Sequence, residues 1–109
     1  MNKLSVTCSD WRPFKRNTLL GFARVRIAVL DMTIHEVALH ERDGKTWAQP
    51  PARPWVKDGA VVLGDNGKIQ YSPIIEFDRR EVRDAFSRAV VAAVLAYAPN
   101  AFAKESVVA

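Results

Sequence analysis

Apolar and polar residues alternate through residues 19–29, which is the period expected of a β-strand with one buried face. One face of this strand would carry Ala23, Val25, Ile27 and Val29. The other face would carry Phe22, Arg24 and Arg26. The pattern therefore predicts that two arginines project outward together from the same strand.

Similar patterns predict three further strands around it. Residues 4–14 form a first strand that ends in a turn, and residues 32–41 form a third. The apolar phase of the third strand changes near His35 and Glu36, which predicts a β-bulge. Asp43 and Gly44 then predict a tight hairpin into a fourth strand at residues 45–49.

The next segment is punctuated by proline and glycine. Three prolines within residues 50–58 disfavour a regular ladder and predict a stiff, extended loop. The runs 60–63 and 68–75 flank a Gly-Asp-Asn-Gly turn at residues 64–67, which predicts another hairpin.

A helix is predicted from Asp78, which would cap the first turn while Glu81 completes a capping box. Its apolar stripe would be Val82, Phe86, Ala89, Val90, Ala93, Val94 and Tyr97. The fold class is therefore α+β: a small antiparallel sheet of five to six strands with hairpins, covered by one C-terminal helix. The 109 residues fit one domain at 1–98, with 99–109 as a frayed tail or a docking segment.

Charge narrows the class of partner. Sixteen Lys and Arg residues against twelve Asp and Glu give a formal charge of +4, which favours polyanionic partners. Residues 12–26 hold five cations and no acid: Arg12, Lys15, Arg16, Arg24 and Arg26. Trp11, Phe14 and Phe22 are interleaved with them, a combination that single-stranded nucleic acid uses. The alternative is that the phenylalanines are core and the arginines only solvate the sheet.

A second basic group lies in the proline-rich loop and at the start of the helix. Its members are Arg53, Lys57, Arg79, Arg80, Arg83 and Arg88, with Trp55 among them. The arginines at the start of the helix are predicted to form a basic strip on its exposed side, and the alternative is an ordinary solvated helix face.

No catalytic, metal or cofactor site is predicted. His35 and His40 lie five residues apart on one strand, and no close carboxylate pair sits among apolar residues. The lone Cys8 is interpreted as a reduced, buried residue. With no leader and no apolar run of about 18 residues, we expect a cytoplasmic protein that is not an enzyme, does not enter membranes and takes no small-molecule substrate.

The order of motifs resembles the bacterial SpoVG-like family, the stage V sporulation protein G or septation regulators. The matching positions are Gly21 to Ala23, Val25, Ile27, Ile34 to Val37, Gly44, Trp47, Ala48, Pro50, Pro73, Ile74, Arg79, Val82, Asp84 and Ala85. They span roughly residues 4–90. The chain departs from the family in the loop, which carries about eight extra residues before Pro73, and in a longer helix.

The resemblance implies a homodimer that forms through the sheet and binds DNA and RNA to regulate gene expression or cell division. It also implies that the segment after Pro50 and the start of the helix contact nucleic acid. Together with the outward strand face, the predicted nucleic-acid contacts are Arg24, Arg26, Arg53, Lys57, Arg79, Arg80 and Arg83. The competing hypothesis is a protein-interaction or oligomerisation module that does not bind nucleic acid.

Overall fold

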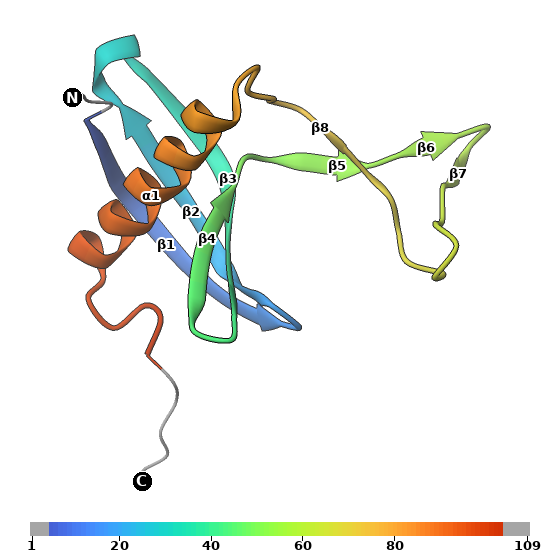
Figure 1. The fold of residues 1–109 in the computed structure, drawn as a ribbon, viewed down its shortest axis with the longest axis horizontal. Helices are drawn as coiled ribbons and strands as arrows, with labels where there is room; N and C mark the ends of the chain where they lie inside the picture. The colour runs from blue at the N-terminus through green and yellow to red at the C-terminus, as the bar shows by residue number, and fades with distance from the viewer. Residues whose placement is uncertain (1–4, 104–109) are drawn as a thin grey trace, which may run out of the picture.

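The computed structural model describes residues 5–103 and contains a four-stranded antiparallel sheet with a helix packed on one face (Figure 1). The strands follow chain order: β1 (Val6–Arg16), β2 (Leu19–Ile27), β3 (Met32–Arg42) and β4 (Lys45–Gln49). A 3-10 turn at Ala28–Leu30 joins β2 to β3, and α1 (Arg80–Tyr97) follows the strands. The α+β class with one C-terminal helix is confirmed.

The alternation in β2 sorts its residues between two faces as predicted. Ala23, Val25 and Ile27 are each less than 5% exposed. Ala23 faces Val37 across the β2/β3 ladder. Phe22, Arg24 and Arg26 lie on the sheet face that α1 does not cover, which we call the open face.

Two predicted local features of β3 are confirmed. Ala23 pairs with Val37 but Val25 pairs with Ile34, so β3 carries one extra residue at this point. Glu36 has a φ of 59°, and it marks the bulge that restores the apolar phase. At the other end of β3, Asp43 and Gly44 both have positive φ, as a two-residue hairpin turn requires.

The helix covers the sheet through part of its predicted stripe. Phe86, Val90, Ala93 and Val94 are buried, whereas Tyr97 is 50% exposed. The predicted start was wrong: α1 begins at Arg80, its N-cap is Arg79, and no side chain caps it. Backbone bonds to the Arg79 carbonyl from Val82 and Arg83 close the first turn instead.

Residues 50–75 leave the body of the protein as an arm (Figure 1). It holds β5 (Ala52–Pro54) paired with β8 (Tyr71–Pro73), and β6 (Val56–Lys57) paired with β7 (Ala60–Val61). The expectation that the prolines prevent ladder pairing was too strong, because Pro54 itself pairs with Tyr71. The predicted hairpin around Gly64 is present, since Leu63 bridges Ile69.

The arm makes the molecule wide and flat. Its extents are 43 × 42 × 22 Å, and its radius of gyration is 15.2 Å. A compact domain of this length would have a radius of gyration of about 13 Å. No residue from Ala52 to Pro73 is buried, so this part of the arm has no hydrophobic core of its own.

The chain turns back onto the body after α1. Ala101 and Phe102 pack against the core, and the Phe102 ring meets Trp11 edge-on at 5.8 Å. Of the predicted tail, residues 99–103 therefore behave as a docking segment. Residues 104–109 lie outside the described part of the chain.

Candidate nucleic-acid interface

The open face presents one continuous row of side chains across all four strands. Strand register pairs Arg12 with Phe22, Phe22 with Ala38, and Ala38 with Gln49. Paired residues in neighbouring strands point to the same side of a sheet. The bulges in β1 and β3 adjust the register so that this row lies on the open face, while the residues that alternate with it along the strands stay in the core.

Two pairs of stacked rings lie on this face. Phe14 and Phe22 stack at 6.3 Å between centroids with a 26° interplanar angle. His40 and Trp47 stack at 5.5 Å and 11°. Phe14 is 53% exposed, so its ring is available to a further planar group.

Three arginines lie on the open face, one of them against a ring. The Arg12 guanidinium carbon lies 5.7 Å from the centroid of the Phe22 ring, and its Nη2 donates to Glu36 at 2.6 Å. Arg24 Nε donates to Ser9 Oγ at 2.9 Å, and Arg26 pairs with Asp31 at 2.7 Å. Ion pairs this exposed contribute about 0–1 kcal/mol, so a phosphate can displace the carboxylates.

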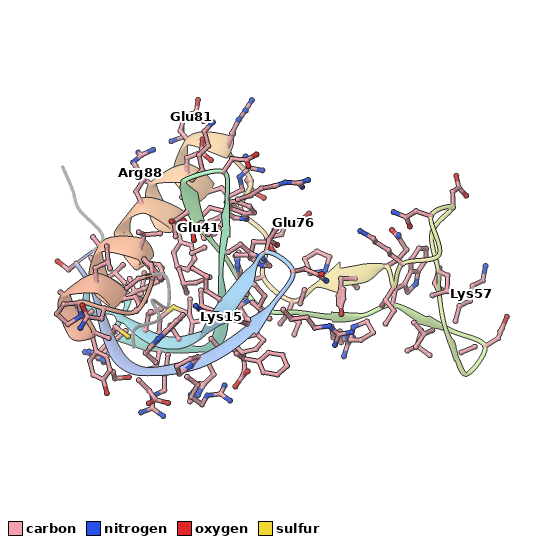
Figure 2. All side chains as sticks on the ribbon, turned by 90° about the horizontal axis from the view of Figure 1, so that it is seen from below. Lys15, Glu41, Lys57, Glu76, Glu81 and Arg88 are labelled. Carbon is pink, nitrogen blue, oxygen red and sulfur yellow. The ribbon has the colours of Figure 1, made fainter. Side chains whose placement is uncertain are left out.

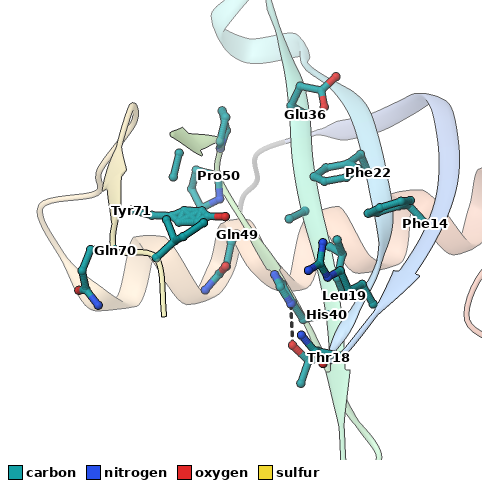
Figure 3. Close-up of a pocket in the computed structure, with 16 residues that line it drawn as sticks. Phe14, Thr18, Leu19, Phe22, Glu36, His40, Gln49, Pro50, Gln70 and Tyr71 are labelled. Atoms are coloured by element: carbon teal, nitrogen blue, oxygen red, sulfur yellow. Dashed lines mark hydrogen bonds between the residues drawn. The ribbon is translucent and has the colours of Figure 1, made fainter. Parts of the chain in front are cut away.

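A groove of about 800 Å³ runs between the open face and the root of the arm (Figure 3). Phe14, Phe22 and His40 line the sheet side, while Pro50 and Tyr71 line the arm side. Thr18 Oγ1 lies 3.0 Å from His40 Nδ1 and fixes that ring at the floor. A groove of this volume accepts one or two aromatic bases.

The structure places the seven predicted contact residues in three separate groups. Arg24 and Arg26 lie on the open face, and Arg53 and Lys57 are exposed on the arm. Arg79, Arg80 and Arg83 lie at the start of α1, which covers the other face of the sheet. Figure 2 shows Lys57 far out on the arm and Arg88 on the helix layer. Of the seven, only Arg83 reaches the arm root, where it lines a second groove of about 470 Å³ together with Tyr71.

Comparisons with family models, curated proteins and solved structures found no match to this chain. The case for a function therefore depends on the geometry of the open face and of the arm.

Sequence reasoning missed His40, Trp47 and Tyr71 as members of the site. The first two could have been found by counting back from the Asp43–Gly44 turn. A two-residue turn pairs Arg42 with Lys45 and therefore His40 with Trp47, as observed. Tyr71 carried no such signal, because its place depends on how the arm leaves the body.

The remaining reactive residues are placed in ways that limit their chemistry. Cys8 is half-buried and its thiol donates to the Asp10 carbonyl oxygen. Burial raises the pKa of the Cys8 thiol, which keeps it protonated and weakly nucleophilic at neutral pH. Within residues 5–103, no three His, Cys, Asp or Glu side chains are grouped to hold a metal ion. No described helix is long and apolar enough to cross a membrane.

Proposed function

We propose that this protein binds single-stranded nucleic acid on the open face of its sheet. The observation that carries the proposal is the stacked Phe14–Phe22 pair beside the groove, with the Arg12 guanidinium over one of its rings. Exposed rings on a sheet stack on unpaired bases, and neighbouring arginines neutralise phosphates. The regulatory role in gene expression or cell division stays a prediction from the resemblance to the SpoVG-like family.

Single strands fit this face better than a duplex does. The rings can contact a base only by its flat side, and a duplex keeps the flat sides of its bases inside the stack. The groove beside Phe14 is walled by Tyr71, so a base entering it would lie between rings of the sheet and the arm. DNA and RNA both satisfy these contacts, and the experiment decides between them.

Cations continue the site along β2. Residues two apart on a strand are about 6.7 Å apart, so Phe22, Arg24 and Arg26 form a line on the open face. A strand whose base stacks on the exposed ring of Phe14, beside Phe22, would run its phosphates past the two arginines. Binding should then weaken as salt rises, because each neutralised phosphate releases counterions.

Fluorescence anisotropy with labelled single-stranded DNA, single-stranded RNA and duplex DNA, at two salt concentrations, tests the proposal. We expect single strands to bind more tightly than duplex and the affinity to fall with salt. Phe14→Ala should weaken binding of single strands by roughly tenfold, since one base stacked on an aromatic ring contributes about 1–3 kcal/mol. Absence of single-strand binding at low salt would refute the proposal.

Matched variants separate the open face from general charge and general aromatic exposure. Tyr97→Ala on α1 removes a ring that is 50% exposed, against 53% for Phe14. Arg88→Glu, at an exposed helix position outside the seven predicted contacts, changes the net charge as much as Arg24→Glu. Only the open-face variants should lose affinity beyond the loss expected from charge alone. Equal losses from the two members of each matched pair would contradict an open-face site.

A protein-interaction module is the second candidate, and the apolar surface of the arm favours it. Trp55, Val56 and Leu63 are each at least 50% exposed, and nothing in the described chain covers them. Exposed apolar surface of this kind marks contacts with proteins. Such binding would be insensitive to salt, unlike the binding of nucleic acid.

A further inference from the structure

The arm exposes more apolar surface than any other part of the molecule. Seven large apolar side chains between residues 55 and 74 are 44% to 59% exposed. They are Trp55, Val56, Val61, Leu63, Ile69, Tyr71 and Ile74. The remainder of the described chain is much longer and has only six exposed large apolar side chains. A patch this dense requires an explanation that scattered surface residues do not.

The arm has little internal structure to hold it in place. Its strands are two or three residues long, and each pairs with only one neighbour. Isolated two-stranded ribbons are at best marginally stable in water. A surface that packs on the arm would both cover the apolar residues and stabilise the ribbon.

Area and charge both fit a second copy of this chain as the partner. Seven side chains at roughly 100 Å² each expose on the order of 700 Å² per copy in total, so a contact that covers most of them approaches the ~800 Å² per partner of a stable interface. The arm carries ions of both signs: Arg53, Lys57 and Lys68 with Asp58 and Asp65. Three cations against two anions leave each arm with a charge of only +1, and a two-fold contact can bring the cations of each near the anions of the other.

The sheet edge is less suited to this role. β1 is an outer strand of the sheet and carries Pro13, Lys15 and Arg16. Proline and cations on an edge strand oppose pairing with another chain. At the other edge, the Ala48 N–H of β4 is already bonded to Ser87 Oγ at 2.9 Å. These features argue against a dimer that forms by pairing of sheet edges, which is one form of the sheet-mediated dimer expected from the sequence.

We propose that the arm is the dimerisation element, and that the arms of two copies pack together through their apolar side chains around a two-fold axis. This contact leaves the Phe14–Phe22 pair outside the interface. Ile69 and Tyr71 line the groove and also belong to the apolar surface of the arm. Phe14 belongs only to the groove and Leu63 only to the arm, so variants at Phe14 and Leu63 test the two proposals separately.

Sedimentation velocity of the full chain from low to high micromolar concentration tests the proposal. We expect a dimer for the wild type and for Leu30→Glu, a control that is 61% exposed outside the arm. Leu63→Glu, 58% exposed on the arm, should raise the dissociation constant by roughly tenfold or more, because a carboxylate is costly to bury in an apolar contact. Unchanged circular dichroism should show that both variants fold.

A monomeric wild type, or a Leu63→Glu variant that dimerises as well as Leu30→Glu, would overturn the proposal. Hydrogen exchange above and below the dissociation constant gives a second readout. Protection should rise with concentration in residues 52–74, and a rise confined to β1 or β4 would indicate a sheet-mediated dimer instead. Phe14→Ala should remain dimeric, and Leu63→Glu should still bind single strands, so failure of one proposal is distinguishable from failure of the other.

Discussion

The body and the arm reach their order by different physical means. In the body, β1 to β4 and α1 enclose a core in which Val25, Val37, Leu39, Val90 and Val94 have no exposed surface. In the arm, turns and short ladders define the path and no side chain from Ala52 to Pro73 is buried. The comparison teaches that the body has a buried core to stabilise it, whereas the arm displays apolar surface that nothing in the described chain covers.

The largest difference should come from deleting one apolar side chain in each region. Phe86 is 1% exposed at the centre of the helix–sheet contact, so Phe86→Ala should lower the free energy of unfolding by about 3–5 kcal/mol. Leu63→Ala on the arm should change it by less than ~0.5 kcal/mol under conditions that keep the protein monomeric. Urea unfolding measures both. A comparable loss from Leu63→Ala would show that the arm belongs to the folding unit of the body.

Two glycines that are not in the left-handed region offer a sharper comparison. A Cβ on Gly21 would collide with the Arg12 carbonyl oxygen and lie 2.8 Å from the Trp11 ring, in the rigid β1/β2 ladder. Gly21→Ala should therefore destabilise the protein by roughly 1–3 kcal/mol. A Cβ on Gly64 would meet only the flexible ends of Gln70 and Asn66, so Gly64→Ala should be near neutral. Differential scanning calorimetry would contradict this contrast if both variants melted together.

The same division governs what the sequence could predict. Period-two alternation located β2, and the phase change at Glu36 located the bulge, because burial on one side imposes a periodic pattern on the chain. The helix stripe was recovered through Phe86 and Val90 for the same reason. The start of α1 was misplaced because Asp78 has the composition of a cap, although backbone contacts at Arg79 close that end.

The arm was harder because nothing buried imposes a period on it. Asp58 and Gly59 both adopt positive φ between β6 and β7, the same turn chemistry as Asp43 and Gly44. Because three prolines lie nearby, the sequence favoured a loop there instead of a hairpin turn. Prediction of the site was incomplete for the same reason. Strand parity placed Arg24 and Arg26 together, but the position of Tyr71 at the wall of the groove depends on the path of the arm.

Removing a single hydroxyl group should weaken the junction between the body and the arm. Ser87 Oγ on α1 accepts a hydrogen bond from the Ala48 N–H, two residues before the arm begins. Ser87→Ala should lower the free energy of unfolding by about 0.5–1.5 kcal/mol, since it leaves that N–H without its acceptor. The matched change Ser72→Ala, also half-buried but in β8, should alter it by less than ~0.5 kcal/mol. Equal effects in urea unfolding would mean that the junction is held by other contacts.

The smallest expected effect is a dependence on pH from the body side of the groove. Burial lowers the pKa of His40 below its ordinary value of 6.5, so the folded protein binds this proton more weakly than the unfolded chain does. Stability from His40 is therefore complete above pH 6.5 and falls as the pH drops from there through the folded pKa. His40→Gln should flatten the free energy of unfolding against pH over that range. A wild-type profile that rises as the pH falls through the window would reverse the sign and show that the imidazolium gains a partner in the folded groove.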